Sequence, residues 1–188
     1  MKNLFNKSII ILFSLTLTFA TTNCVYAQQS GMKAHHASHA DAMTGATSEM
    51  HMDGAEFKDA KVAAIYKSYH ALYEALATDN LQAAQKAAVS LSATAKAVSG
   101  ATGIAAGAKK VASAKTIEAQ RKEFSAISSD MIALFKKGVL KKGEVYAAFC
   151  PMANGGQGAY WLTSEKKIAN PYYGSKMSGC GSIKETLK

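Results

Sequence analysis

The sequence predicts an all-α protein, an antiparallel bundle of three long helices followed by an irregular, Cys- and aromatic-rich C-terminal segment with a short helix. Three observations favour this class. The only prolines are Pro151 and Pro171, so most of the 188-residue chain carries no helix breaker. Apolar residues recur at three- and four-residue spacing in three stretches, which is the period of an amphipathic helix. Apolar residues make up 48% of the chain, enough to build a folded core.

Residues 1–27 are predicted to be a secretory signal peptide. Lys2 and Lys7 precede an apolar run that is too short to span a bilayer comfortably, and Ala27 ends a small-residue cleavage site. Cleavage after Ala27 would place the mature chain in an oxidising periplasmic compartment. The alternative is a lipoprotein tethered to the membrane through a lipidated Cys24.

Residues 28–54 are expected to form a disordered tail rich in His and Met. Imidazole binds copper, nickel and zinc, whereas thioether sulfur selects Cu(I), so the mixture points to copper. We therefore interpret this segment as a secondary site of metal capture; the alternative is a linker of accidental composition. The candidate ligands are Met32, His35, His36, His39, Met43, Met50, His51 and Met52.

The remaining residues, 55–188, are predicted to form the bundle domain. The first helix is expected over about 55–77, after a capping-box-like start at Asp53 to Glu56. Its apolar face comprises Val62, Ile65, Tyr69, Leu72 and Leu76. His70 lies one position off this face and is interpreted as a boundary residue.

Asp79 with Gln82 is expected to cap a second helix that ends at Gly100. The short link predicts an antiparallel hairpin of the first two helices. Residues 100–112 read as a loop or a loosely helical connection. A third helix is expected from Ile117 to near Gly138, with Met131 in the core.

The C-terminal quarter carries the candidate primary site. Cys150 and Met152 flank Pro151, and Met177 and Cys180 are three residues apart, which places them on one face of a helical turn. Two thiolates and two thioethers would form a soft site suited to Cu(I), and also to Ag(I).

A disulfide between Cys150 and Cys180 is the alternative, because paired cysteines in an exported domain commonly form a bridge. It would close a loop of about 30 residues and stabilise the fold by roughly 3–4 kcal/mol on the loop-entropy model. Composition and spacing leave both states open, and a reversible bridge would make metal binding depend on redox poise.

Other classes of function find little support. The formal charge is +9, but Arg121 is the only arginine, and nucleic-acid readers use arginine forks, so no nucleic-acid partner is expected. Residues 154–158 are glycine-rich without the Lys-Ser/Thr ending of a phosphate loop, and we interpret them as a turn. No enzyme activity is predicted. Four aromatic residues are expected to cap the open end of the bundle: Tyr160, Trp161, Tyr172 and Tyr173.

The motifs Phe-Cys-Pro-Met-Ala-Asn at 149–154, Gly-Ala-Tyr-Trp-Leu at 158–162, Asn-Pro-Tyr-Tyr-Gly at 170–174 and Met-x-x-Cys-Gly at 177–181 carry a resemblance to a known family. It is an uncharacterised domain of exported bacterial proteins, found alone and fused to periplasmic adaptor subunits of copper/silver efflux systems. The resemblance covers about residues 55–183. It implies an all-helical domain and an association with heavy-metal handling, with Cys150, Met152, Met177 and Cys180 as the matching site residues.

Together these observations predict a periplasmic protein that binds Cu(I), with Ag(I) as a second ion, as a chaperone or buffer linked to copper efflux and resistance. The expected partners are the metal ion and a periplasmic efflux adaptor or another copper protein. The alternative is a disulfide-stapled helical module of the cell envelope that docks a partner and holds no metal of its own.

Overall fold

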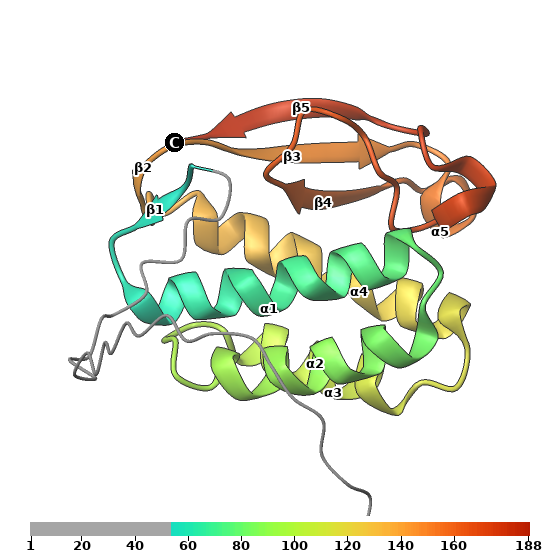
Figure 1. The fold of residues 1–188 in the computed structure, drawn as a ribbon, viewed down its shortest axis with the longest axis horizontal. Helices are drawn as coiled ribbons and strands as arrows, with labels where there is room; N and C mark the ends of the chain where they lie inside the picture. Colours follow the sequence, from blue (N-terminus) through green and yellow to red (C-terminus); the bar gives the residue numbers. More distant parts are fainter. Residues whose placement is uncertain (1–53) are drawn as a thin grey trace, which may run out of the picture. The chain divides into compact units, whose positions relative to one another are not determined.

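The structure is a computed structural model that describes residues 54–188. Three layers are stacked in it (Figure 1): a small antiparallel sheet, the helix pair α1 and α4, and the helix pair α2 and α3. The helices are α1 (Ala60–Ala77), α2 (Leu81–Ala95), α3 (Thr102–Ser113), α4 (Ile117–Phe135), the short α5 (Ala153–Gly156) and the 3-10 helix η1 (Gly174–Met177). The strands are β1 (Glu56–Phe57), β2 (Leu140–Lys142), β3 (Val145–Cys150), β4 (Ala159–Thr163) and β5 (Ser182–Leu187).

The helix-rich character is confirmed, but the all-α prediction is wrong in its strict form. The segment expected to be irregular forms a three-stranded antiparallel sheet in the order β4-β3-β5. Strands β3 and β4 are runs of six and five residues, rich in aromatic and β-branched side chains, which favour extended backbone. The turn expected at 154–158 separates them, and Asn154 there has a φ of 52°.

The described chain has a fourth long helix where a loop or loosely helical connection was expected. Helix α3 occupies residues 102–113 and buries Ile104, Ala108 and Val111 against its neighbours. These buried residues follow helical spacing, but most of the buried face is Ala and Gly, and packing of this face against its neighbours stabilises the helix more than local propensity does.

Helix boundaries differ from the expectation because other side chains act as caps. Helix α1 begins after Asp59, whose carboxylate accepts a hydrogen bond from the Lys61 N–H, about five residues later than expected; Asp53 of the expected capping box lies outside the described residues. Asn80, not Asp79, caps α2 by accepting from the Ala83 N–H at 2.9 Å. Helix α2 ends at Ala95, five residues before Gly100.

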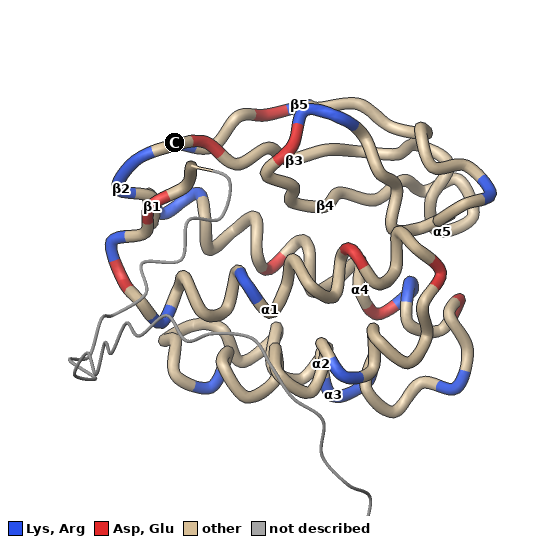
Figure 2. The backbone as a smooth tube through the Cα atoms, in the orientation of Figure 1, with Lys and Arg blue, Asp and Glu red and all other residues tan. Residues whose placement is uncertain are grey.

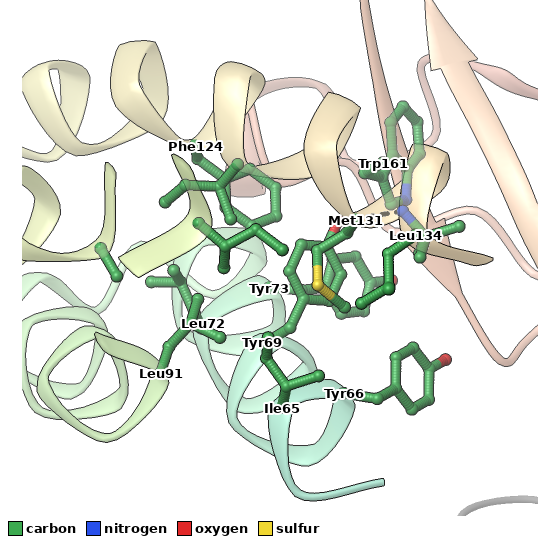
Figure 3. Packing of buried hydrophobic residues seen from close by; sticks show 14 of the residues in the cluster. Ile65, Tyr66, Tyr69, Leu72, Tyr73, Leu91, Phe124, Met131, Leu134 and Trp161 are labelled. Carbon is green, nitrogen blue, oxygen red and sulfur yellow. Dashed lines mark hydrogen bonds between the residues drawn. The ribbon is translucent and has the colours of Figure 1, made fainter. Parts of the chain in front are cut away.

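The core lies between the layers (Figure 3), where large apolar side chains from α1, α2, α4 and β4 meet. Met131 is fully buried there, which confirms its predicted core position. One polar link crosses this core: the Tyr69 hydroxyl accepts from the Leu162 N–H at 3.0 Å and lies 2.8 Å from the Ser128 hydroxyl. This link ties α1 to both β4 and α4.

Charged residues lie over the surface of the described chain, and basic residues recur along α3 and β2 (Figure 2). His70 is half-buried, with its Nδ1 3.6 Å from the Glu74 carboxylate, so its predicted place at the boundary of the helix face is confirmed. None of the helices in residues 54–188 combines the length and the hydropathy needed to cross a membrane.

Candidate thiol site at the end of the sheet

The two cysteines of the described chain meet at one end of the sheet. Cys150 is the last residue of β3 and pairs with Ala159 of β4. Cys180 lies two residues before β5, which pairs with the other edge of β3. The Sγ atoms are 2.7 Å apart, and both residues are free thiols in the structure. Two segments separated by 30 residues thus supply one pair of sulfur atoms.

The two thiols differ in their surroundings. Cys150 is fully buried, whereas Cys180 is half-buried and reaches the surface. The hydrogen bond with Cys150 is the main cause that raises the pKa of the Cys180 thiol above its ordinary value, and desolvation adds to it. The raised pKa means that the protonated form of this thiol predominates at neutral pH.

Buried aromatic side chains lie near the cysteine pair: Trp161 of β4 pairs with Ala148, two residues before Cys150. Trp161 is fully buried, and its ring centroid lies 6.0 Å from that of Tyr172 in an edge-on contact. Gly181, with a φ of 131°, lies so close to Trp161 that a Cβ added there would be 2.7 Å from the indole ring. Burial raises the pKa of the Tyr172 phenol, whose hydroxyl donates to the Tyr160 carbonyl. Of the four aromatics expected to cap the bundle, Trp161 and Tyr172 are buried in the core, whereas Tyr160 is 42% exposed and Tyr173 is half-buried.

Asn170 fixes the loop that carries Cys180. Its side chain is fully buried, and its Nδ2 donates to the Cys180 carbonyl at 2.7 Å. Its Oδ1 accepts from the N–H groups of Tyr172 and Tyr173, at 2.8 and 3.3 Å. The side-chain amide of Asn170 therefore holds the backbone at both Cys180 and Tyr172.

Met152 and Met177 lie on the segments next to the two cysteines. Met152 follows Cys150 by two residues, is 49% exposed, and its carbonyl accepts from the Tyr173 hydroxyl at 2.7 Å. Met177 is half-buried, and its carbonyl accepts from the Cys180 N–H at 3.1 Å. Of the four predicted ligands, the structure brings the two thiols into contact and places each methionine on an adjoining turn.

An ion pair between the buried Arg121 and the exposed Asp79 holds the same loop against the helices. The Arg121 guanidinium, from α4, donates through Nε to the Pro171 carbonyl and through Nη2 to the Leu76 carbonyl, both at 2.8 Å, and to the Asp79 carboxylate. Asp79 also accepts from the N–H and the hydroxyl of Ser175. These bonds, with that to Arg121, lower the pKa of the Asp79 carboxyl to about 2.

Sequence reasoning missed the roles of Asn170, Arg121 and Asp79. Arg121 is the only arginine in the sequence. A single arginine in a lysine-rich chain indicates a position where several hydrogen-bond donors in a fixed geometry are needed. Asn170 precedes Pro171, a pair typical of turns. Asp79 was interpreted as a helix cap, although its φ of 57° takes it out of that role.

Within residues 54–188, no three side chains of His, Cys, Asp or Glu come together as a metal-binding group. The tail ligands Met32, His35, His36, His39, Met43, Met50, His51 and Met52 lie outside the described residues, as do the predicted signal peptide and Cys24.

One comparison with known proteins gives a match. Residues 65–143 are similar to a family described as "Protein of unknown function (DUF3347)". The matched segment runs from the middle of α1 to just past β2, and the cysteine pair lies C-terminal to it. No curated protein and no solved structure matches the chain.

Proposed function

We propose that this protein binds Cu(I) through the thiolates of Cys150 and Cys180, with the thioethers of Met152 and Met177 as further ligands. Ag(I), which shares the preference for soft sulfur, is the second ion. The observation that supports the proposal is the meeting of the two thiols, whose Sγ atoms lie 2.7 Å apart on segments held by β3 and Asn170. Sulfur donors without hard oxygen ligands select Cu(I).

Metal binding requires the sulfurs to separate. Two thiolates on one ion, with metal–sulfur bonds of about 2.3 Å, lie roughly 3.8–4.6 Å apart at tetrahedral to linear angles. Cys180 is the sulfur that can move, by rotation of its side chain: Asn170 holds its backbone carbonyl, but its side chain is half-buried and Ser178 and Gly179 before it are exposed. Cys150, fixed in the ladder of β3, serves as the stationary ligand.

The wider role that fits this site is copper chaperoning or buffering in the periplasm. In this proposal the His/Met tail collects ions and passes them to the thiol pair, and an efflux adaptor or another copper protein receives them. The support is the predicted export signal, the composition of the tail and the resemblance of the Cys/Met motifs to the domain fused to copper/silver efflux adaptors.

The test is a Cu(I) titration of the reduced protein under anaerobic conditions against a chromogenic Cu(I) chelator, with native mass spectrometry to count bound ions. We expect one tightly held ion, and a fall in affinity of at least about a hundredfold in the Cys150→Ser, Cys180→Ser double variant. Met152→Leu and Met177→Leu are expected to lower the affinity by smaller factors. Met131→Leu, at the fully buried core methionine, is the matched control and should leave it unchanged.

Full affinity in the double cysteine variant would place the copper site elsewhere in the chain. One further variant separates the tail from the domain. Exchange of the tail His and Met residues should reduce the number of weakly bound ions while the tight ion remains. Loss of the tight ion in that variant would contradict the division of roles.

A second candidate function is a disulfide-stapled interaction module of the cell envelope without a metal of its own. The Sγ–Sγ distance of 2.7 Å favours it, because a disulfide bond of about 2.05 Å needs a smaller movement than metal loading does. A protein that is isolated as the disulfide, and that takes up no cysteine-dependent copper even after reduction, would support this candidate.

A further inference from the structure

A groove of about 770 Å³ lies between α4, α5 and the turn around η1. Its volume falls in the range of roughly 300–1,000 Å³ that ligand sites occupy. Its polar and aromatic lining comes mainly from Arg121, Lys122, Asn154, Gln157, Tyr173 and Lys176. None of these residues belongs to the proposed metal-binding set.

Arg121 offers this groove a fixed donor. Its side chain is only 8% exposed, and its Nε and Nη2 atoms are taken by the Pro171 and Leu76 carbonyls and by Asp79. The third nitrogen, Nη1, has no hydrogen-bond partner within residues 54–188, yet it is not sealed from solvent. A guanidinium held on two sides with one N–H pair left over is preorganised to receive an acceptor, and charged acceptors form the strongest bonds with it.

The charges around the groove favour an anion. Lys122 and Lys176 are exposed on its lining, and Glu118 is the one acidic residue among the described residues that line it. Arg121 and the two lysines carry three positive charges. Glu118 and Asp79, which pairs with Arg121, carry two negative charges, so one positive charge remains in excess.

The remaining lining suits a peptide. The amide side chains of Asn154 and Gln157 can both donate and accept, which matches the alternating N–H and C=O groups of a main chain. The Tyr173 ring adds an apolar surface, and its hydroxyl is already bound to the Met152 carbonyl.

We propose that this groove binds an acidic peptide segment of a partner protein, with a carboxylate of the segment on Arg121 Nη1 and its other acidic side chains near Lys122 and Lys176. Because Tyr173 joins the groove to the Met152 turn, such a partner would sit beside the cysteine pair. That last consequence rests on the proposed copper function, whereas the binding of the acidic segment does not.

The experiment uses metal-free protein expressed from the full-length chain, so that its outcome is independent of copper binding. The probe is a fluorescein-labelled hexapeptide, Gly-Asp-Glu-Asp-Glu-Gly, followed by fluorescence anisotropy. The comparison peptide carries Asn and Gln in place of Asp and Glu. We expect the acidic peptide alone to bind, and the Lys122→Glu, Lys176→Glu variant to bind it at least about tenfold more weakly.

The matched control is Lys86→Glu, Lys109→Glu, which makes the same change in net charge at two exposed lysines of α2 and α3 outside the groove. We expect the affinity of this control variant for the acidic peptide to stay within about twofold of that of the parent protein. In the parent protein, we expect the peptide to change backbone NMR shifts only at Ala153–Gln157, Tyr173 and the first turns of α4. Equal weakening in both variants would show attraction to net charge alone and would overturn the proposal. Absence of binding, or equal binding of the amide peptide, would overturn it as well.

Discussion

The side-chain amide of Asn170 donates a hydrogen bond to the backbone carbonyl of Cys180, with 2.7 Å between Nδ2 and the oxygen. Both residues belong to the C-terminal loop, and this hydrogen bond also affects where the Cys180 thiol lies. Asn170 is fully buried and also holds the N–H groups of Tyr172 and Tyr173. The position of the Cys180 thiol opposite Cys150 therefore depends on a residue whose side chain bonds to the backbone of this loop.

Replacing Asn170 by Ala should strongly destabilise the protein. The variant leaves the Cys180 carbonyl and the Tyr172 N–H without their partner, and each unpaired buried group costs about 1–3 kcal/mol. We expect a loss of about 2–4 kcal/mol in the free energy of unfolding, measured by urea denaturation of the reduced protein. Asn154→Gly is the control: Asn154 is exposed and has a φ of 52°, which glycine adopts without strain, so we expect a loss below about 1 kcal/mol. Similar losses in both variants would contradict this role of Asn170.

Oxidation of the cysteine pair should stabilise the fold. A bridge from Cys150 to Cys180 closes a loop of about 30 residues, for which the loop-entropy model gives roughly 3–4 kcal/mol. We expect the oxidised protein to unfold at higher urea concentration than the reduced protein, with thiol titration reporting the redox state. The Cys150→Ser, Cys180→Ser variant should show no response to reductant. Equal stability of the oxidised and reduced forms would mean that the bridge distorts the native loop.

Asp79, which accepts hydrogen bonds from Ser175 and pairs with Arg121, should make stability depend on pH in the acidic range. The Asp79 carboxyl has its pKa lowered from 3.8 to about 2, so the folded state binds a proton less readily than the unfolded state. Its stabilising contribution is present above the unfolded pKa of about 4 and is lost as the pH falls through about 2. We expect the melting temperature to fall over that window, and the fall to be smaller in Asp79→Asn.

Asparagine is the suitable replacement at this position because Asp79 has a left-handed backbone, with a φ of 57°, and Asn tolerates that region. Asp59→Asn is the control, since Asp59 caps α1 at its exposed start. An identical acid profile in the parent and in Asp79→Asn would assign the acid sensitivity to other carboxyl groups.

Tyr69→Phe should lower the stability of the protein substantially, although it removes only the hydroxyl oxygen. The Tyr69 hydroxyl is buried, accepts from the Leu162 N–H and bonds with Ser128, so its removal leaves two buried groups unpaired. We expect a loss of about 1–3 kcal/mol in the free energy of unfolding. Tyr160→Phe, at a ring that is 42% exposed, should change it by less than about 0.5 kcal/mol. Guanidinium denaturation followed by Trp161 fluorescence measures both, and a neutral effect of Tyr69→Phe would show that water replaces the hydroxyl.

The sequence predicted the helices best where neighbouring residues alone determine the structure. The apolar spacing through Ile65, Tyr69 and Leu72 predicted α1, and the spacing through Phe124, Ile127 and Met131 predicted α4. Helix α3 was missed because its buried face is built mainly from Ala and Gly, and Ile104 and Val111 are its only large apolar residues. The sheet was missed because the short runs at β3 and β4 become strands only when they pair with each other and with β5.

The sequence likewise predicted one part of the candidate site and left the other part to the tertiary structure. The sequence by itself determined which soft donors exist, since Cys150, Met152, Met177 and Cys180 can be read directly from the chain. Only the tertiary structure decided that the two thiols meet, and that Asp79 holds Ser175 across 96 residues of sequence. The physical reason is that helical periodicity is set by contacts between residues three or four apart, whereas a site of this kind depends on strand pairing and buried polar bonds between distant segments.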